Sequence, residues 1–412
     1  MITESDCLAL DRADPLSHCR ERFSLPDNLI YFDGNSLGPM PRQVMGRVES
    51  TVKEEWGRGL IGSWNDAHWF DLPQILGDRL GKMLGANVGQ VVVCDSTSIN
   101  LFKCIQGALN INSRRSIVLA QSDNFPTDLY ILEGIKKHCN RSIDIKLMPA
   151  GSEVMDYLTD DIAVVLLSHI NYRTGSLLNL EEITAACASK GIMVVWDLCH
   201  SAGVVPIELD RAGVDFAVGC GYKFLNGGPG APSFLYVASR HIGQAQQPLS
   251  GWWGHIQPFA FDSEYSPDPG IKRYLCGTQP IISMQAMSSG LETFNGVDIA
   301  VAREKSMALT QLFIDLLQQE CEGMGIETAC AEDAEARGSQ VSFSFEYAYE
   351  LMQALIEQGV VGDFRAPNIM RFGLAPLFNQ YIEVWSAVQK IKQCTLDQVW
   401  LDGKYAHRKA VT

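Results

Sequence analysis

Seven short apolar runs between residues 91 and 237 constrain the fold of this chain more than any other feature. Segments with a helical pattern, such as 127–139 and 179–190, separate several of these runs. Continuous runs of Val, Ile and Leu joined by helices are typical of strands that are covered on both faces, as in parallel sheets. The pattern therefore predicts an α/β fold with a mostly parallel seven-stranded sheet in a large domain, its strands at 91–94, 116–120, 143–147, 162–167, 192–196, 214–219 and 233–237.

The chain after residue 281 predicts a smaller α+β unit. Two helices are expected over 281–320, strands and one helix between 339 and 375, and a final helix from about Gln380 to Lys392. Residues 251–280 are aromatic, rich in turns and without a regular period, which is typical of a binding segment or an interface. The chain should therefore consist of three parts: an N-terminal segment (1–45) that packs near the small domain, a large α/β domain (46–290) and a small C-terminal α+β domain (291–412).

The net charge, the apolar runs and the cysteines exclude some classes of function and indicate a cellular location. Thirty-three Lys and Arg against 48 Asp and Glu give a net charge of −15, which lacks the basic surface that nucleic-acid binding needs. No apolar run approaches the roughly 18 residues of a membrane span, and the N-terminus has no apolar signal core. The 12 cysteines show no CxxC spacing and most lie within apolar runs, as expected of thiols in a reducing compartment. We expect a cytoplasmic protein that binds neither nucleic acid nor membrane.

Polar residues that end the apolar runs are the candidates for a functional site. Open α/β sheets bind their ligands at the carboxyl ends of the strands, so residues that follow different strands can meet in one crevice. The residues at these positions are Asp95, Ser96, Thr97, Ser98, Phe125, Asp128, Ser168, His169, Asp197, His200, Tyr222 and Lys223.

Lys223 and Asp197 form the most informative pair among these candidates. Taken singly, Lys223 has the position of a surface lysine and Asp197 that of a helix N-cap. Together, they are what a pyridoxal phosphate site requires, because a lysine forms the Schiff base with the aldehyde and a carboxylate keeps the pyridine nitrogen protonated. Burial would also lower the pKa of the lysine towards that of a nucleophilic amine. Ser96, Thr97 and Ser98 open a helical stretch, so they are either ordinary N-caps or donors to a phosphate.

Nine segments distributed over the chain give a resemblance to a known family. Two of them, WDLCHSAG and GYKFLNGGPGAP, have looser counterparts in related enzymes, whereas GNSLG, FPTD and GWWGH are more specific. With these segments the chain resembles the kynureninase family, whose members have the fold-type I, transferase-like architecture and use pyridoxal phosphate to cleave L-kynurenine to anthranilate and L-alanine. The segments begin at residues 31, 63, 95, 122, 167, 196, 219, 251 and 367.

The resemblance implies roles for individual residues. Lys223 would form the Schiff base, Asp197 would contact the pyridine nitrogen with Asp128 nearby, and Tyr222 is the candidate for a proton relay. Arg371 would bind the α-carboxylate of the substrate with two parallel hydrogen bonds. The further cofactor contacts that the resemblance implies are Thr97, Ser98, Phe125, Ser168, His200, Trp252 and Thr278, and no metal is expected.

The resemblance also implies a homodimer with shared active sites. In this family, residues near Gly277 and Thr278 reach into the site of the neighbouring subunit. The substrate would be L-kynurenine of tryptophan and kynurenine metabolism, in tryptophan breakdown or in NAD biosynthesis, with 3-hydroxykynurenine as a second possible substrate.

Three alternatives stay open at this point. A cysteine desulfurase or lyase shares the fold type but needs a reactive cysteine on a mobile loop, for which Cys276 and Cys330 are the loop candidates. An aminotransferase also shares the fold type, although the FPTD and GWWGH segments argue against it. A non-catalytic interaction protein would not bind the cofactor, so a cofactor absorbance band would exclude it.

Overall fold

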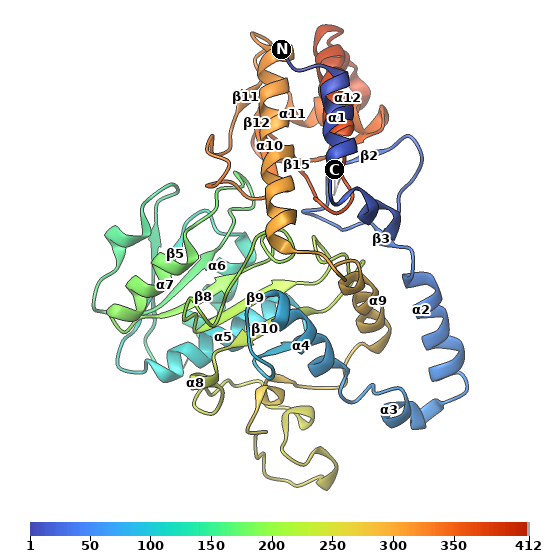
Figure 1. Cartoon of the computed structure of the whole chain (residues 1–412). Helices are drawn as coiled ribbons and strands as arrows, with labels where there is room; N and C mark the ends of the chain where they lie inside the picture. The colour runs from blue at the N-terminus through green and yellow to red at the C-terminus, as the bar shows by residue number, and fades with distance from the viewer. Residues whose placement is uncertain (140, 410–412) are drawn as a thin grey trace.

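A seven-stranded sheet forms the centre of the computed structural model, which describes residues 1–139 and 141–409 (Figure 1). All seven predicted strands are present, and their ends lie within two residues of the predicted ones. In spatial order across the sheet they are β4 (Val91–Val93), β10 (Ser233–Val237), β9 (Phe216–Cys220), β8 (Met193–Asp197), β7 (Ile162–Ser168), β5 (Ile117–Gln121) and β6 (Asp144–Met148).

The sheet is mostly parallel, as predicted, and β10 is the strand that runs against its neighbours. It pairs antiparallel with both β4 and β9, whereas β9, β8, β7, β5 and β6 pair parallel in sequence across the sheet. The reversed direction places the first residue of β10, Ser233, opposite Cys220 at the carboxyl end of β9. A residue at the start of β10 thus lies at the same edge as residues that end the parallel strands.

Helices cover both faces of the sheet, which explains why its strands are apolar throughout. One face packs against α5 (Thr97–Ile111) and α6 (Pro126–His138). The other face packs against α4 (Leu72–Met83), α7 (Leu180–Ser189) and α9 (Ile281–Glu292). Successive residues of one strand belong to different cores: Val194 and Trp196 of β8 face the second group of helices, and Val195 faces the first.

A second, smaller sheet with its own hydrophobic core follows in the sequence. It has the order β11-β12-β15-β14 and is antiparallel throughout. The predicted helices and strands of this region are present, and the short strands β11, β13 and β14 were not predicted. The elements are α10 (Ile299–Cys321), β11 (Glu327–Thr328), β12 (Gln340–Ser344), α11 (Ala348–Glu357), β13 (Val360–Val361), β14 (Asp363–Arg365), β15 (Ile369–Gly373) and α12 (Tyr381–Leu396).

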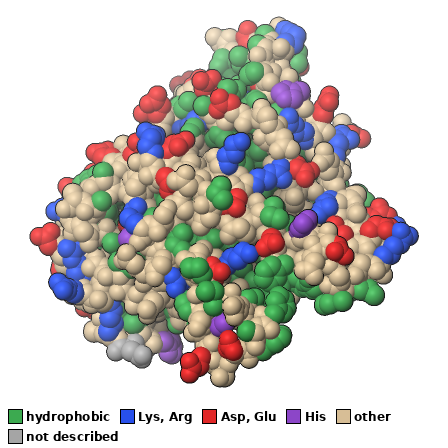
Figure 2. Space-filling model, turned by 60° about the horizontal axis from the view of Figure 1, so that its bottom comes forward, with side chains coloured by type: hydrophobic (Ala, Val, Ile, Leu, Met, Phe, Trp, Pro, Cys, Tyr) green, Lys and Arg blue, Asp and Glu red, His purple; other side chains and the backbone are tan. Residues whose placement is uncertain are grey.

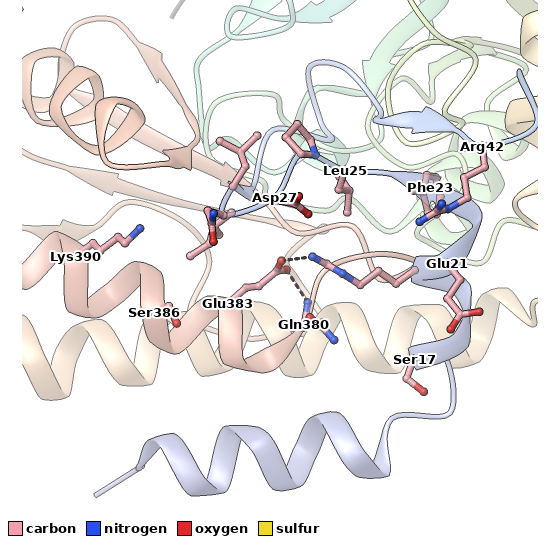
Figure 3. A pocket seen from close by; sticks show the side chains of 15 residues that line it. Ser17, Glu21, Phe23, Leu25, Asp27, Arg42, Gln380, Glu383, Ser386 and Lys390 are labelled. Atoms are coloured by element: carbon pink, nitrogen blue, oxygen red, sulfur yellow. Dashed lines mark hydrogen bonds and ion pairs between the residues drawn. The ribbon is translucent and has the colours of Figure 1, made fainter. Parts of the chain in front are cut away.

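The N-terminal segment lies against the small domain. Helix α1 (Glu4–Ala13) runs beside α12 (Figure 1), and β2 (Ile30–Tyr31) pairs in parallel with β13. Arg20 forms an ion pair of 2.7 Å with Glu383 of α12, beside a polar cavity of about 720 Å³ (Figure 3). We propose on these contacts that residues 1–45 form a unit with the C-terminal domain, with the large domain extending to residue 290.

The remaining helices and strands before α4 are short. These are β1 (Phe23–Ser24), which pairs antiparallel with β3 (Met40–Pro41), and the helices α2 (Val44–Ser50) and α3 (Ser63–Asp66).

Residues 251–280 contain only short turns of 3-10 helix, η5 (Trp252–Gly254), η6 (Pro258–Ala260) and η7 (Ile271–Tyr274). They follow α8 (Ser239–Ile242) and project from the end of the molecule opposite the small domain (Figure 1). Among the residues described, none of the helices combines the length and apolarity that a membrane span needs.

Candidate active site

A cavity of about 180 Å³ opens at the carboxyl ends of β7, β8 and β9. It collects ten of the residues that the sequence predicted for the site, namely Ser96, Thr97, Ser98, Phe125, Asp128, Ser168, Asp197, His200, Tyr222 and Lys223. Their convergence follows from the register of the parallel strands. Ser168, the last residue of β7, lies opposite Asp197, the last residue of β8, and Asp197 lies opposite Val218 of β9.

Lys223 lies three residues beyond the end of β9 and points towards the cavity. Its Nζ is 3.0 Å from Nε2 of His200 and 5.8 Å from the centre of the Phe125 ring. Burial, followed by the charges of Lys223, Arg371 and Arg365, lowers the pKa of His200 well below its usual value. The imidazole is therefore neutral and can accept a hydrogen bond from the lysine.

Two buried carboxyl groups form the opposite side of the cavity. Asp197 Oδ1 accepts a hydrogen bond of 2.8 Å from the backbone N–H of Cys199. Burial and then the charge of Asp197 raise the pKa of Asp128 well above its usual range. Oδ2 of Asp128 is buried and finds no hydrogen-bond partner in the described part of the chain. A protonated ring nitrogen fits beside these two carboxyl groups, because it would pair its positive charge with Asp197 and bring a donor to a site in which Oδ2 of Asp128 has no partner among the described residues.

The third part of the cavity is suited to an anion. Helix α5 begins at Thr97, and its N-cap residue, Ser96, makes no side-chain hydrogen bond to the first turn. The first N–H groups of a helix lack partners within the helix, and the helix dipole favours negative charge there. Thr97 Oγ1 lies 3.0 Å from Oγ of Ser233, whose own proton is donated to the backbone oxygen of Gly219, so the Thr97 hydroxyl is the one that can turn to an anion and add to these donors. The residues present therefore fit the phosphate of pyridoxal phosphate.

Trp252 and Thr278 do not line this cavity in the single chain. Trp252 is 40% exposed and packs against Trp253 and Phe259. Thr278 lines an adjoining cavity that shares Ser96 and Tyr222 with the first. Their predicted cofactor contacts stay predictions, and both side chains remain open to a second subunit.

Three other candidates from the sequence lie beside the cavity. Arg371 is only 1% exposed, and its Nη1 donates a hydrogen bond to the backbone oxygen of Tyr172, a residue of the cavity wall. Asp95 forms an ion pair of 2.6 Å with Lys103 of α5. His169 is buried and packs edge-on against Trp196, outside the cavity.

The sequence reasoning missed several residues of the cavity wall. Ser233 was missed because only strand direction brings the start of β10 to this edge. Cys220 ends β9 and was counted as an apolar residue, although the same strand-end argument applied to it. The other missed residues are Thr127, Ile170, Tyr172, Cys199 and Ala231.

Comparisons with known proteins show the family to which the chain belongs. Residues 302–391 match a family model described as the kynureninase C-terminal domain. The chain is 45% identical to the kynureninase of Burkholderia pseudomallei (strain 1106a) over 416 aligned residues, which cover 100% of both chains. The kynureninase of Pseudomonas fluorescens gives the same identity and the same coverage.

Solved structures share the fold at low sequence identity. A mutant of C-DES with glycine covalently linked to the pyridoxal phosphate cofactor superimposes with a TM-score of 0.79 at 17% identity, covering 90% of this chain and 98% of that one. The cysteine desulfurase CsdA of Escherichia coli gives a TM-score of 0.78 at 17% identity, covering 93% and 98%. The architecture and the cavity thus define a fold-type I pyridoxal phosphate-dependent enzyme. Within that class, the full-length identity places the chain in the kynureninase family.

Proposed function

We propose that this chain uses pyridoxal phosphate to cleave L-kynurenine hydrolytically to anthranilate and L-alanine. The observation that carries the proposal is the arrangement of Lys223, His200, Asp128 and Asp197 in one cavity whose far end is the open N-terminus of α5. The 45% identity to kynureninases over the full chain supports the choice of substrate. The reaction class is hydrolysis of a carbon–carbon bond next to a ketone.

Each of the cavity residues would have a separate role in this reaction. Bound pyridoxal phosphate supplies an aldehyde that bonds to an amine and a ring that stores the electron pair released at the α-carbon. Lys223 would hold the cofactor and then remove the α-proton of the substrate. Neutral His200 orients the lysine through the contact of 3.0 Å, and Asp197 would keep the ring nitrogen protonated. Burial raises the pKa of Tyr222, so this residue would transfer protons as a neutral phenol.

Water and the substrate complete the chemistry. Water adds to the aryl ketone, and cleavage of the bond between the β- and γ-carbons releases anthranilate and leaves the three carbons of L-alanine. Arg371, beside the cavity wall, would bind the α-carboxylate. Phe125 would stack on the cofactor ring, and Thr97 and Ser98 at the start of α5 would hold its phosphate.

The cysteine desulfurase alternative lacks a suitable nucleophile at the two loop positions. Cys276 donates a hydrogen bond of 3.1 Å to the backbone oxygen of Leu249, and burial raises its pKa. Burial also raises the pKa of Cys330. Because the thiolate is the reactive form of cysteine, neither residue is activated.

The active enzyme is proposed to be a homodimer. Trp252, Phe259 and Phe261 are 40%, 61% and 80% exposed on the projecting segment 251–280. Figure 2 turns this end of the molecule forward and shows hydrophobic side chains gathered on it. A second subunit would cover these side chains and bring Trp252 and Thr278 of each chain to the cavity of the other. The cytoplasm stays the proposed location.

The proposal is tested with the purified holoenzyme. L-Kynurenine should release fluorescent anthranilate and an equal amount of L-alanine, and Lys223→Ala should lower turnover by more than about 10⁴-fold, because one residue serves two steps. Circular dichroism and the unfolding temperature of the variant should match the parent. The same assay with 3-hydroxykynurenine measures the preference between the two substrates. Retention of a tenth of the rate in Lys223→Ala would refute the role of this lysine.

A further inference from the structure

Arg371 is hydrogen-bonded to residues that have no role in the proposed function. Its Nε donates a hydrogen bond of 2.8 Å to Oδ1 of Asp363, and its Nη2 donates to Oδ2 of the same carboxylate. Nη2 also contacts Oγ of Ser36 at 3.0 Å. Asp363 therefore occupies one edge of the guanidinium, and Nη1 donates to the backbone oxygen of Tyr172. Nη1 keeps one N–H without a partner among the described residues, so an incoming carboxylate would bind there.

A second arginine and a second carboxyl group complete the arrangement. Arg365 Nη2 lies 2.8 Å from Oδ2 of Asp363, to which Ser36 Oγ donates a hydrogen bond of 2.6 Å. Asp33 lies beside these residues, because its backbone oxygen accepts a hydrogen bond of 2.9 Å from the N–H of Ser36 and it forms a parallel bridge with Gly373, two residues after Arg371. The charges of Asp363 and Arg371 act on its carboxyl group. Oδ1 of Asp33 is buried and has no hydrogen-bond partner among the described residues. We call Asp33, Ser36, Asp363, Arg365 and Arg371 the carboxylate-receiving cluster.

The net charge of this cluster depends on the proton of one residue. Burial opposes ionisation of Asp363, but the charges and hydrogen bonds of Arg371 and Arg365 outweigh it and lower the pKa of Asp363. Asp33 is in the opposite situation, because burial and then the charge of Asp363 raise its pKa to about 8. Two arginines and one carboxylate leave one positive charge, whereas ionisation of Asp33 brings the cluster to neutrality.

We propose that Asp33 is a positioning residue that controls whether the carboxylate-receiving cluster binds an anion. As a neutral acid beside Asp363 it leaves one positive charge on the two arginines, and as a carboxylate it cancels that charge. The ligand would be the α-carboxylate of the substrate, so the inference rests on the proposed function and deepens it. Asp33 acts through Arg371 rather than on the reacting atoms.

The neighbours of Asp33 do not obscure its titration. Tyr31, on β2, feels the charges of Asp33 and Asp363, and burial raises its pKa, so it stays neutral throughout the range of the experiment. His200, which feels both arginines, is neutral because its pKa is lowered. The charged groups that face Asp33 are thus Asp363 and Arg365 from β14 and Arg371 from β15.

The test uses a carboxylate whose own charge is constant. 4-Oxo-4-phenylbutanoate has the aryl ketone and the carboxylate of kynurenine but no amine, so it neither reacts with the cofactor nor titrates between pH 6 and 10. Calorimetry on the holoenzyme in two buffers of different ionisation enthalpy gives its affinity and the protons taken up on binding. The affinity should be constant well below pH 8 and fall towards about tenfold per pH unit above it, with uptake of close to one proton there.

Three controls separate Asp33 from other groups. Asp33→Asn keeps the shape of the side chain without its charge, so the affinity should no longer fall above pH 8 and proton uptake should disappear. Asp27→Asn removes an exposed carboxylate nearby in the sequence and should behave as the parent. The neutral amide 4-oxo-4-phenylbutanamide should bind independently of pH. Asp33→Ser serves the same purpose as Asp33→Asn if the latter does not fold.

The inference fails if the parent protein takes up no proton with this probe between pH 8 and 9.5. It also fails if Asp33→Asn retains the same decrease in affinity. The proposed function has a separate readout, the release of anthranilate. If the probe binds with proton uptake but L-kynurenine is not cleaved, the role of Asp33 stands and the proposed activity is refuted. If L-kynurenine is cleaved but the probe binds without proton uptake, the activity stands and the role of Asp33 is refuted.

Discussion

At the scale of single residues, Asp197 and Asp128 are chemically alike but are expected to serve differently. Asp197 should be the carboxylate that keeps the pyridine nitrogen protonated, so Asp197→Asn should lower kcat by about 100-fold or more while some cofactor stays bound. The raised pKa of Asp128 keeps that group neutral before the cofactor binds, so Asp128→Asn should cost only about tenfold. Steady-state rates with saturating cofactor measure both, and equal losses would contradict the division of roles.

Arg371 should not tolerate replacement by lysine, although the charge is kept. The guanidinium contacts Asp363, Ser36 and the backbone oxygen of Tyr172 at once, which one ammonium group cannot do. Arg371→Lys should lower kcat/KM for L-kynurenine by roughly 10- to 150-fold, which corresponds to about 1.5–3 kcal/mol. The cofactor absorbance should be unchanged, because Arg371 lies on β15 of the small domain and does not line the cavity. A loss of cofactor with normal kcat/KM would remove Arg371 from the substrate site.

Residues at strand ends were the part of the site that the sequence could predict. Asp197 and Lys223 follow long apolar runs, so their place at one sheet edge follows from the pattern alone. Asp33 and Asp363 could not be paired in this way, because they are 330 residues apart and follow strands of two residues. Such contacts depend on how the N-terminal segment packs against β14, which no local pattern encodes.

At the scale of elements, Lys103 of α5 forms an ion pair with Asp95, just before the helix, and a hydrogen bond with the backbone of Tyr274 in η7. Lys103 is fully buried and donates both to Asp95, whose side chain is 27% exposed, and to the backbone oxygen of Tyr274. Replacing one partner leaves the charge of the other unpaired. The resulting loss of stability depends on how well water reaches that remaining charge.

The two halves of this pair should therefore have unequal effects on stability. Asp95→Asn leaves a buried ammonium without its counter-ion and should lower the free energy of unfolding by about 2–4 kcal/mol, whereas Lys103→Met leaves a carboxylate that water can reach and should cost about 1–2 kcal/mol. Asparagine also tolerates the positive φ of 48° at position 95, so the backbone is matched. Denaturant titrations measure both values, and the reverse order would contradict the argument.

Elements with a long, clear hydrophobic pattern were predicted from the sequence, whereas strands of two or three residues were not. The strands of the central sheet are buried on both faces, so their apolar runs are long enough to see in the sequence. Strands β13 and β14 have two and three residues and form because the N-terminal segment and β15 lie beside them. Their pairing is a property of the tertiary structure rather than of local preference.

At the scale of the whole molecule, two of the residues predicted to contact the cofactor, Trp252 and Thr278, do not line the cavity of the single chain. Three aromatic side chains of the projecting segment, Trp252, Phe259 and Phe261, are exposed, and hydrophobic side chains gather at this end of the molecule (Figure 2). A homodimer in which each chain completes the site of the other explains both observations. Dimerisation is also a property that strand and helix patterns do not report, so the sequence predicted it only through resemblance.

Mixed dimers provide the sharpest test of the shared site. Lys223→Ala and Trp252→Ala should each be poorly active alone, because one lacks the lysine and the other lacks the aromatic side chain supplied to its partner. Unfolding and refolding an equal mixture should give about one half mixed dimers, each with one intact site, and hence about one quarter of the wild-type activity. If Trp252 served its own chain, the intact lysine and the intact tryptophan would never meet in one site, and the mixture would show only the average of the two variants. That average would refute the shared site while leaving the proposed reaction untouched.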